Sequence, residues 1–115
     1  MRRGEIRLVN FDPIRGSQAA KRRPAVVVSN DGPNTAASSS GAGVVTVVPL
    51  TSNVTTVHDF QVLILASESM LSVDSKAQAE QVRAVAVQRV GLAVGTLGPA
   101  TMRKLDTALR IHLNI

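Results

Sequence analysis

Short β-branched runs separated by polar segments dominate the chain as far as residue 97. The stretch EIRLVNF, residues 5–11, alternates polar and apolar positions, which predicts a strand. Its packing positions are Ile6, Leu8 and Phe11, with a weaker contribution from Val9. Runs rich in Val, Ile and Leu predict further strands over residues 24–30, 44–50, 60–65 and 91–97.

The segment SKAQAEQVRAV, residues 75–85, is harder to assign because most of its apolar residues are small. Two sets of residues alternate along it: Ala77, Ala79, Gln81 and Arg83 in one, and Lys76, Gln78, Glu80 and Val82 in the other. This alternation predicts one continuous strand that turns the two sets to opposite sides.

Polar segments rich in small residues connect these strands and predict loops. Residues 12–23 contain Pro13 and Gly16, which interrupt any regular pattern. The glycine- and serine-rich stretch 31–43 predicts a mobile loop. Loops are also expected over residues 51–59 and 66–74, the second with a short edge strand.

The C-terminal segment has a helical period instead. Its apolar face would consist of Met102, Leu105, Leu109, and His112 or Leu113. Gly98 suits the N-cap and Pro99 the first helical position. This pattern predicts one amphipathic helix that must lie on an apolar surface.

The elements add up to a mainly β (α+β) protein with about six to seven short, mostly antiparallel strands and a C-terminal helix. A small, strongly bent barrel with the helix packed against it fits this order of elements. Neither a repeat nor a linker interrupts the pattern, so residues 1–115 are expected to form a single domain.

Composition narrows the chemistry. The chain has two Phe and no Trp, Tyr or Cys, so its core must consist of Val, Leu, Ile and Ala. Disulfides and thiolate metal sites are excluded. The N-terminus lacks the apolar run of a signal peptide, and no apolar run is long enough to span a membrane. A cytoplasmic protein without membrane attachment is therefore expected.

The chain is basic, with 13 Lys and Arg against 8 Asp and Glu, a formal net charge of +5 and a pI of about 11.1. Arg predominates, and its planar guanidinium pairs with phosphate through two hydrogen bonds. This favours a polyanionic partner such as nucleic acid, although ordinary solubilising charge is the alternative. The stretch KRRPAVVVSND places three cations directly before a buried strand. It could be a solvated turn or the rim of an anion site.

Four segments in order resemble the MazF/PemK toxin family, the small endoribonucleases of toxin–antitoxin operons. These are RRGEI, GSQ followed by RRPAVVVSN, VVPLTSN and AEQVRAV, and together with the final helix the resemblance extends from Arg3 to Leu113. It implies an SH3-like barrel, a homodimer and metal-independent cleavage of single-stranded RNA. It also implies a cognate, MazE-like antitoxin whose acidic C-terminal tail would occupy the RNA groove.

The resemblance also assigns residues. It places the catalytic pair at Arg23, in the Arg-Pro motif, and Thr51, in the Pro-x-Thr motif. Glu80 would be a base or would orient Arg23. The RNA-binding candidates are Arg15, Gln18, Lys21, Arg22, Ser52, Asn53, His58, Gln81 and Arg83. Each has a simpler alternative: the arginines as solvated charge, Thr51 as a turn residue bonded to local backbone, and His58 as a solvated loop residue.

The implied reaction suits this composition. The RNA 2′-hydroxyl attacks the adjacent phosphorus and leaves a 2′,3′-cyclic phosphate and a 5′-hydroxyl, so neither a protein nucleophile nor a cofactor is required. The protein would supply positioning, charge stabilisation and proton transfer. Arg23 fits the charge role but is a poor base, because its pKa exceeds about 12. The base is left unassigned.

The chain departs from the family pattern at three places. Gln18 stands where relatives often have Glu, Arg7 where many have an aromatic residue, and His58, Asp59 and Phe60 where many have Tyr-Pro-Phe. The RNA sequence that the chain would cut therefore cannot be derived from the family pattern.

There are two rival functions. One is a CcdB-type gyrase poison, which relies on a C-terminal Trp-Gly-Ile absent here. The other is a non-catalytic RNA-binding barrel, which would need more aromatic residues than Phe11 and Phe60.

Overall fold

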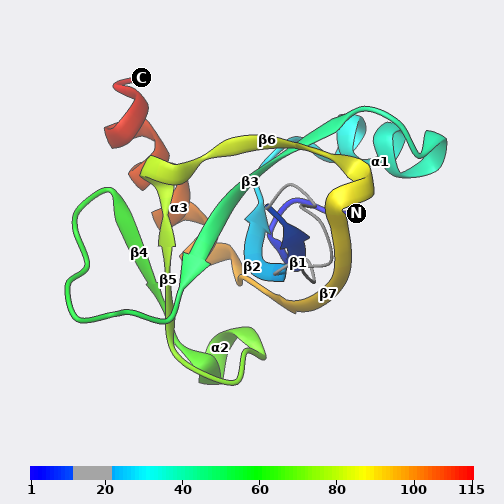
Figure 1. Ribbon diagram of the computed structural model, residues 1–115. Helices are drawn as coiled ribbons and strands as arrows, with labels where there is room; N and C mark the ends of the chain where they lie inside the picture. Colours follow the sequence, from blue (N-terminus) through cyan, green and yellow to red (C-terminus); the bar gives the residue numbers. More distant parts are fainter. Residues whose placement is uncertain (12–21) are drawn as a thin grey trace.

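The computed structural model describes residues 1–11 and 22–115, and within them seven antiparallel strands form one bent sheet (Figure 1). The strands are β1 (Glu5–Asn10), β2 (Arg22–Val27), β3 (Val44–Thr51), β4 (Gln61–Ile64), β5 (Ser75–Gln78), β6 (Arg83–Ala86) and β7 (Val90–Thr96). The helices are α1 (Asp31–Ser40), α2 (Ala66–Ser69) and α3 (Pro99–Leu113), with short 3-10 turns at Ala79–Gln81 and Val87–Arg89.

The strand order is β4-β5-β3-β2-β1-β7, and β6 pairs with β3 on the same edge as β5. The predicted number of antiparallel strands and the C-terminal helix are confirmed. The sheet curls strongly but does not close, because β4 and β7 end the two sides of the path without pairing to each other. The architecture is therefore an open, barrel-like sheet.

Both faces of the sheet are covered by apolar clusters, which we call the helix-side cluster and the far-side cluster. The helix-side cluster packs under α3 and consists of Ile6, Val26, Val48, Leu50, Val62, Ile64, Ala77, Ala79, Leu97, Leu105 and Ala108. The far-side cluster consists of Val9, Ala25, Val27, Ala37, Val45, Val47, Val85 and Val87. Alternate residues of β3 enter one cluster or the other, so a slip of one residue in its register would exchange the two sets.

Coverage of both faces explains a wrong assignment in β1. Val9, given little weight from the pattern, is fully buried in the far-side cluster, and Phe11 packs beside it. Ile6 is buried in the opposite, helix-side cluster, whereas Leu8 is only half-buried. Alternation identifies which residues share a face, but it cannot show that both faces are covered.

The expected mobile loop over residues 31–43 is instead largely helical. Asn30 caps the N-terminus of α1 by accepting a hydrogen bond from the Gly32 amide, and Gly41 ends the helix in the left-handed conformation with φ 67°. The fully buried Asn34 side chain donates to the Ser29 carbonyl oxygen at 2.8 Å. Ala37 enters the far-side cluster. These tertiary contacts outweigh the weak helix propensity of a serine- and glycine-rich segment.

Two other predictions need correction. Residues 66–74 begin with the short helix α2 and contain no strand. Residues 75–85 are two strands, β5 and β6, separated by the 3-10 turn Ala79–Gln81. That turn changes the phase of the alternation.

Helix α3 begins as predicted, with Gly98 as the N-cap and Pro99 as the first residue. Leu105 is buried in the helix-side cluster, with Met102 and Leu109 partly buried against it. Ala108 is also buried on this face, whereas the predicted continuations His112 and Leu113 are exposed. The helix extends beyond the sheet that it covers. In the described residues no helix is long and apolar enough to cross a membrane.

Arg7, which replaces the expected aromatic residue in the first strand, is held by polar contacts. Its guanidinium donates to the Gly91 carbonyl oxygen at 3.1 Å and forms an ion pair with Glu5 at 3.2 Å. Burial raises the pKa of Glu5, but the hydrogen bond from the Arg2 amide and the charge of Arg7 outweigh burial, so the pKa lies below its ordinary value. β1 is thus joined to β7 by a salt-bridged arginine.

Gly95 allows α2 to pack against β7. A Cβ atom at position 95 would lie 2.2 Å from the Ser69 carbonyl oxygen, a backbone atom that cannot rotate away. We expect Gly95→Ala to lower the free energy of unfolding by about 1–3 kcal/mol, the typical cost of overpacking. Denaturant unfolding measures this change.

The control is Gly32→Ala in α1, where a Cβ atom would meet nothing within 4 Å. That variant should remain within about 0.5 kcal/mol of the wild type. Equal stability of both variants would contradict the packing assigned to Gly95.

Candidate functional site

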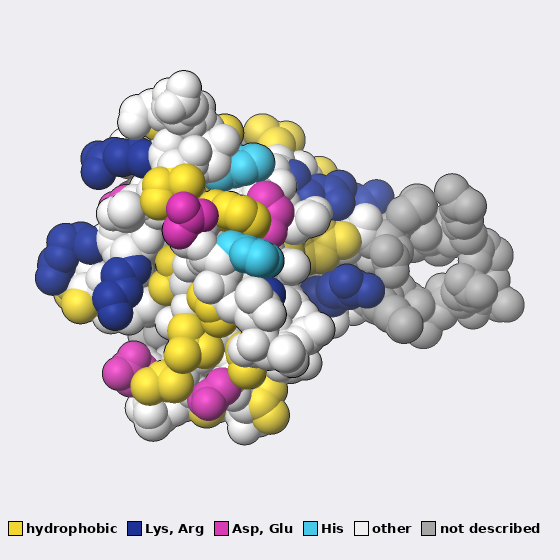
Figure 2. Space-filling model, turned by 90° about the vertical axis from the view of Figure 1, so that its left-hand side faces the viewer, with side chains coloured by type: hydrophobic (Ala, Val, Ile, Leu, Met, Phe, Trp, Pro, Cys, Tyr) yellow, Lys and Arg dark blue, Asp and Glu magenta, His cyan; other side chains and the backbone are white. Residues whose placement is uncertain are grey.

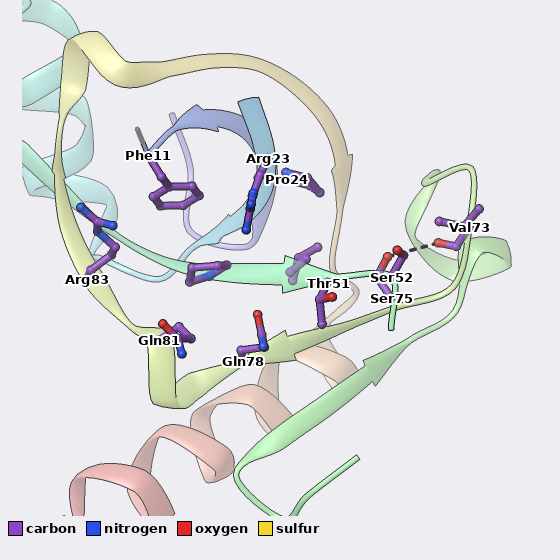
Figure 3. A pocket seen from close by; sticks show the side chains of 12 residues that line it. Phe11, Arg23, Pro24, Thr51, Ser52, Val73, Ser75, Gln78, Gln81 and Arg83 are labelled. Atoms are coloured by element: carbon purple, nitrogen blue, oxygen red, sulfur yellow. Dashed lines mark hydrogen bonds between the residues drawn. The ribbon is translucent and has the colours of Figure 1, made fainter. Parts of the chain in front are cut away.

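A cavity of about 770 Å³ opens on the far side of the sheet, where the far-side cluster ends (Figure 3). It is lined by Phe11, Arg23, Pro24, Pro49, Leu50, Thr51, Ser52, Val73, Ser75, Gln78, Gln81 and Arg83. Two arginines and no acidic residue are among these lining residues. The cavity is therefore positive and suits an anionic ligand.

The pairing of β2 with β3 directs Arg23 and Thr51 to the same face of the sheet. Ala25 of β2 is the Cα partner of Pro49 in β3, and the same register continued by two residues brings Arg23 level with Thr51. Side chains two residues apart on a strand share a face, so both follow Ala25 and Pro49 to the far side. The two residues of the sequence-predicted catalytic pair thus line one cavity from neighbouring strands.

β5 and β6 contribute the opposite wall by the same rule. Thr51 is the Cα partner of Lys76, so Gln78, two residues further along β5, also faces the cavity. Arg83 is the Cα partner of Val47, a member of the far-side cluster. Arg83 and Gln78 therefore share a face, whereas continuous alternation predicts opposite ones. The 3-10 turn between the strands reverses that prediction.

Thr51 is partly exposed and its hydroxyl is suitably placed to donate. Its Oγ1 accepts a hydrogen bond from the Asn53 amide at 3.2 Å, which is the local turn contact expected of such a residue. Because the oxygen acts there as an acceptor, the hydroxyl proton remains available to a ligand in the cavity. The hydrogen bond from Asn53 holds Thr51 in the turn, and the Thr51 hydroxyl can still donate to a ligand.

The Arg23 side chain is exposed and forms no hydrogen bond or ion pair with another residue in the described part of the chain. Pro24 follows it and favours extended backbone at position 23. Arg83 lies over the ring of Phe11, with its guanidinium carbon 5.2 Å from the ring centroid. The cavity therefore combines a free guanidinium with a second one stacked on an aromatic ring.

Glu80 does not line the cavity. Its Oε2 accepts a hydrogen bond from the Gln61 side-chain amide at 2.7 Å, and Gln61 in turn accepts one from the His58 backbone amide at 3.1 Å. This chain of bonds runs toward the loop between β3 and β4. The geometry favours an orienting role on that loop over direct contact with Arg23.

The same loop has a second anchor. The largely buried Lys76 donates from Nζ to the Thr56 carbonyl oxygen at 2.5 Å. The His58 ring stacks on Phe60, with centroids 5.1 Å apart and an interplanar angle of 11°. His58 is exposed but lies outside the cavity lining, as does Asn53, whereas Ser52 lines it.

The other RNA-binding candidates separate in space. Gln81 and Arg83 line the cavity. Arg22 does not; its guanidinium lies over Gly91 of β7, where a Cβ atom would be 2.4 Å from Nη1. Arg15, Gln18 and Lys21 lie outside the described residues.

Figure 2 shows a different face, with Asp and Glu side chains, both histidines and scattered hydrophobic residues on its surface, and Lys and Arg toward its sides. The described residues contain no group of three or more His, Asp or Glu suited to hold a metal ion.

Sequence reasoning missed several lining residues, of which Phe11 and Gln78 offer the most to a ligand. The pattern predicts Phe11 as a packing residue, and Phe11 counts among the aromatic residues available for base stacking but not among the sequence-predicted site residues. Gln78 was hidden by the assumption of one continuous strand. Recognition of the turn at residues 79–81 would have placed Gln78 and Arg83 on one face, but the position of Gln78 near Thr51 depends on the pairing of β5 with β3.

Comparison with known proteins shows the family. Residues 2–113 match the family described as PemK-like, MazF-like toxin of type II toxin–antitoxin system. The chain is 52% identical over 115 residues to endoribonuclease MazF9 of Mycobacterium tuberculosis (strain ATCC 25618 / H37Rv), covering 100% of this chain and 98% of that relative.

Solved structures support the same fold. The M. tuberculosis toxin MazF-mt6 superposes with a TM-score of 0.77 at 17% identity, covering 96% of this chain and 97% of that one. A mycobacterial endoribonuclease in complex with its cognate antitoxin gives 0.76 at 23% identity, with 100% and 96% coverage. MazF from Deinococcus radiodurans gives 0.75 at 20% identity, with 100% and 97% coverage.

The family match over residues 2–113 and the relative that is 52% identical over the full chain together show the family. This chain belongs to the PemK-like, MazF-like toxin family of type II toxin–antitoxin systems.

Proposed function

We propose that this chain is the toxin of a type II toxin–antitoxin system and acts as a sequence-specific endoribonuclease on single-stranded RNA. The observation that carries the proposal is the placement of Arg23 and Thr51 at one positive cavity on adjacent strands. The relative that is 52% identical over the full chain is named an endoribonuclease, which supports the same activity here. Cleavage of RNA in the cytoplasm would then inhibit translation and growth.

The proposed reaction uses the nucleophile of the substrate. The 2′-hydroxyl oxygen forms a bond to the adjacent phosphorus while the bond from phosphorus to the 5′-oxygen breaks. The 2′-hydroxyl loses its proton to a base, and the departing 5′-oxygen gains one. The products are a 2′,3′-cyclic phosphate and a 5′-hydroxyl end, and no cofactor enters this balance.

Arg23 and Thr51 would stabilise the charge that develops on phosphorus. The guanidinium can hold two non-bridging oxygens at once, and the Thr51 hydroxyl can donate to one of them. Arg23 could also donate the proton to the departing oxygen, while the base stays unassigned. Glu80 would act indirectly, by orienting the loop between β3 and β4 through Gln61.

The remaining cations would position the RNA backbone. Arg83 and Gln81 line the cavity and Ser52 lies beside Thr51, so these residues would contact RNA directly. Arg22, Asn53 and His58 would extend the binding surface beyond the cavity. Arg15, Gln18 and Lys21 remain RNA-binding candidates on the grounds of sequence alone. Such an extended basic surface suits a flexible single strand.

Two protein partners complete the proposal. The first is a second copy of this chain in a homodimer. The second is a cognate, MazE-like antitoxin whose acidic C-terminal tail would occupy the same cavity. Similar folds have been solved as a mycobacterial endoribonuclease with its cognate antitoxin and as MazE-MazF from D. radiodurans. Carboxylates of an acidic tail would meet the unpaired guanidinium of Arg23.

The direct test is incubation of the purified protein with RNA in EDTA. We expect cleavage to proceed without metal and to leave cyclic phosphate and 5′-hydroxyl ends, which end-specific ligation and sequencing identify. RNA that is bound but not cut would favour a non-catalytic RNA-binding barrel. Inhibition of gyrase without RNA cleavage would favour the gyrase-poison alternative.

Arg23→Lys and Thr51→Val should each lower the single-turnover cleavage rate by about 10²–10³-fold, the usual loss for one donor to a developing oxyanion. Lysine keeps the charge but loses the paired donors of the guanidinium. Valine keeps the shape and the β-branching but lacks the hydroxyl. Melting temperatures should change by only a few degrees, since neither side chain is buried.

Matched controls lie away from the cavity. Arg103→Lys on α3 and Thr96→Val at the end of β7 change exposed residues and should keep wild-type rates. Near wild-type cleavage by Arg23→Lys, or inactivity caused only by unfolding, would contradict the catalytic assignment.

RNA affinity should depend strongly on salt. Each phosphate neutralised on a single strand contributes about −0.7 to the slope of log K against log salt concentration. With about four to six phosphate contacts, the slope should be about −3 to −4. Binding titrations with the Thr51→Val variant, which keeps every cation, would measure it, and an affinity independent of salt would exclude an electrostatic interface.

A further inference from the structure

Two glutamines that pair across β4 and β5 have opposite surroundings. Gln61 and Gln78 are Cα partners in this ladder. The Gln61 side chain is buried and uses both ends of its amide, accepting from the His58 backbone and donating to Glu80. The Gln78 side chain is half-buried, lines the cavity and bonds to no other residue in the described part of the chain. Gln61 therefore links the loop at His58 to Glu80, whereas the side-chain amide of Gln78 is available to a ligand in the cavity.

The position of Gln78 relative to Thr51 is fixed by the strand ladder. Thr51 is the Cα partner of Lys76, and Gln78 follows two residues later on the same face. Figure 3 shows the Gln78 side chain pointing from the end of β5 into the cavity, between the side chains of Thr51 and Gln81. A base next to a phosphate bound at Thr51 would thus lie near the side-chain amide of Gln78.

The chemistry of the side chain separates its role from that of the arginines. A guanidinium offers only donors, which suits phosphate oxygens. A neutral amide offers a donor beside an acceptor, which matches a base edge that presents an acceptor beside a donor. In single-stranded RNA the base edges are unpaired and accessible to such a side chain. The cavity therefore contains charged groups for the backbone and an unsatisfied amide suited to a base.

We propose that Gln78 is a specificity-determining residue that reads the edge of one RNA base bound in the cavity beside the cleaved phosphate. This inference rests on the proposed ribonuclease function and adds a residue that determines the sequence of the cut site. Gln78 contacts the base and takes no part in proton transfer. Arg23 and Thr51 act on the phosphate, so recognition and chemistry use different side chains of one cavity.

The test is a comparison of the wild type with Gln78→Met, which keeps the length and flexibility of the side chain but lacks the amide. Both proteins cut a pool of RNAs with randomised sequence, and the new 5′-hydroxyl ends are sequenced. We expect the preference at one position of the cut site to fall by about tenfold or more, the discrimination given by one good amide-to-base pair. Preferences at the other positions should persist.

A second measurement distinguishes a loss of base recognition from a general loss of activity. For two RNAs that differ only at the affected position, the wild type should show a ratio of kcat/KM of about ten or more, and Gln78→Met a ratio near one. The melting temperature should stay within a few degrees, since the amide bonds to no described residue. Gln88→Met serves as the matched control, because Gln88 bonds the Gly41 carbonyl oxygen and does not line the cavity.

Unchanged preferences in Gln78→Met, or an equal loss at every position, would overturn the assignment of Gln78. A wild-type chain that cuts no RNA would instead overturn the proposed function and this inference with it. Since the wild type is measured in the same experiment, these outcomes are distinguishable.

Discussion

The register of β3 is the constraint on which the rest of the structure depends. This strand pairs with β2 along one edge and with β6 and then β5 along the other. Val45 and Val47 are buried on one side of the sheet and Val48 and Leu50 on the other, so neither face tolerates a shift by one residue. Every side chain of the cavity wall contributed by β2, β5 and β6 takes its position from that register. The site is thus held by apolar burial outside the cavity.

The arginines of this basic protein differ in whether they are available to bind a phosphate. The guanidinium of Arg23 is left without a partner in the described structure, whereas those of Arg3 and Arg7 form ion pairs with Asp106 and Glu5. The strand fixes the backbone of Arg23 beside the cavity, and its unpaired guanidinium remains available to pair with a phosphate. Loose surface charge would attract the same polyanion but would not position its phosphate.

Sequence alone was informative where local chemistry decides the structure. Gly98 and Pro99 mark the start of α3 by their own backbone preferences, and the β-branched runs identify the buried strands. The relation of Arg23 to Thr51 came from the order of motifs, because a single sequence does not reveal which strands pair. The fold then supplied the missing register.

The failures have a common physical origin in tertiary contacts. α1 exists because Asn34 and Ala37 are buried, which no local propensity indicates. Glu80 turns toward Gln61 because the 3-10 turn removes it from the strand pattern. Gln78 was missed for the same reason. A pattern of period two is readable only while the chain remains extended.

The 3-10 turn Ala79–Gln81 limits where members of the family can gain or lose residues. It lies where β3 changes partner from β6 to β5, and its three residues set the phase between Gln78 and Arg83. Gain or loss of one residue there would exchange the two faces of β6, moving Arg83 out of the cavity and Val85 out of its apolar cluster. Changes in length within the loop between β3 and β4 would not alter this phase, because that loop lies outside the segment that joins β5 to β6. Natural length variation should therefore accumulate in that loop and be rare at residues 79–81.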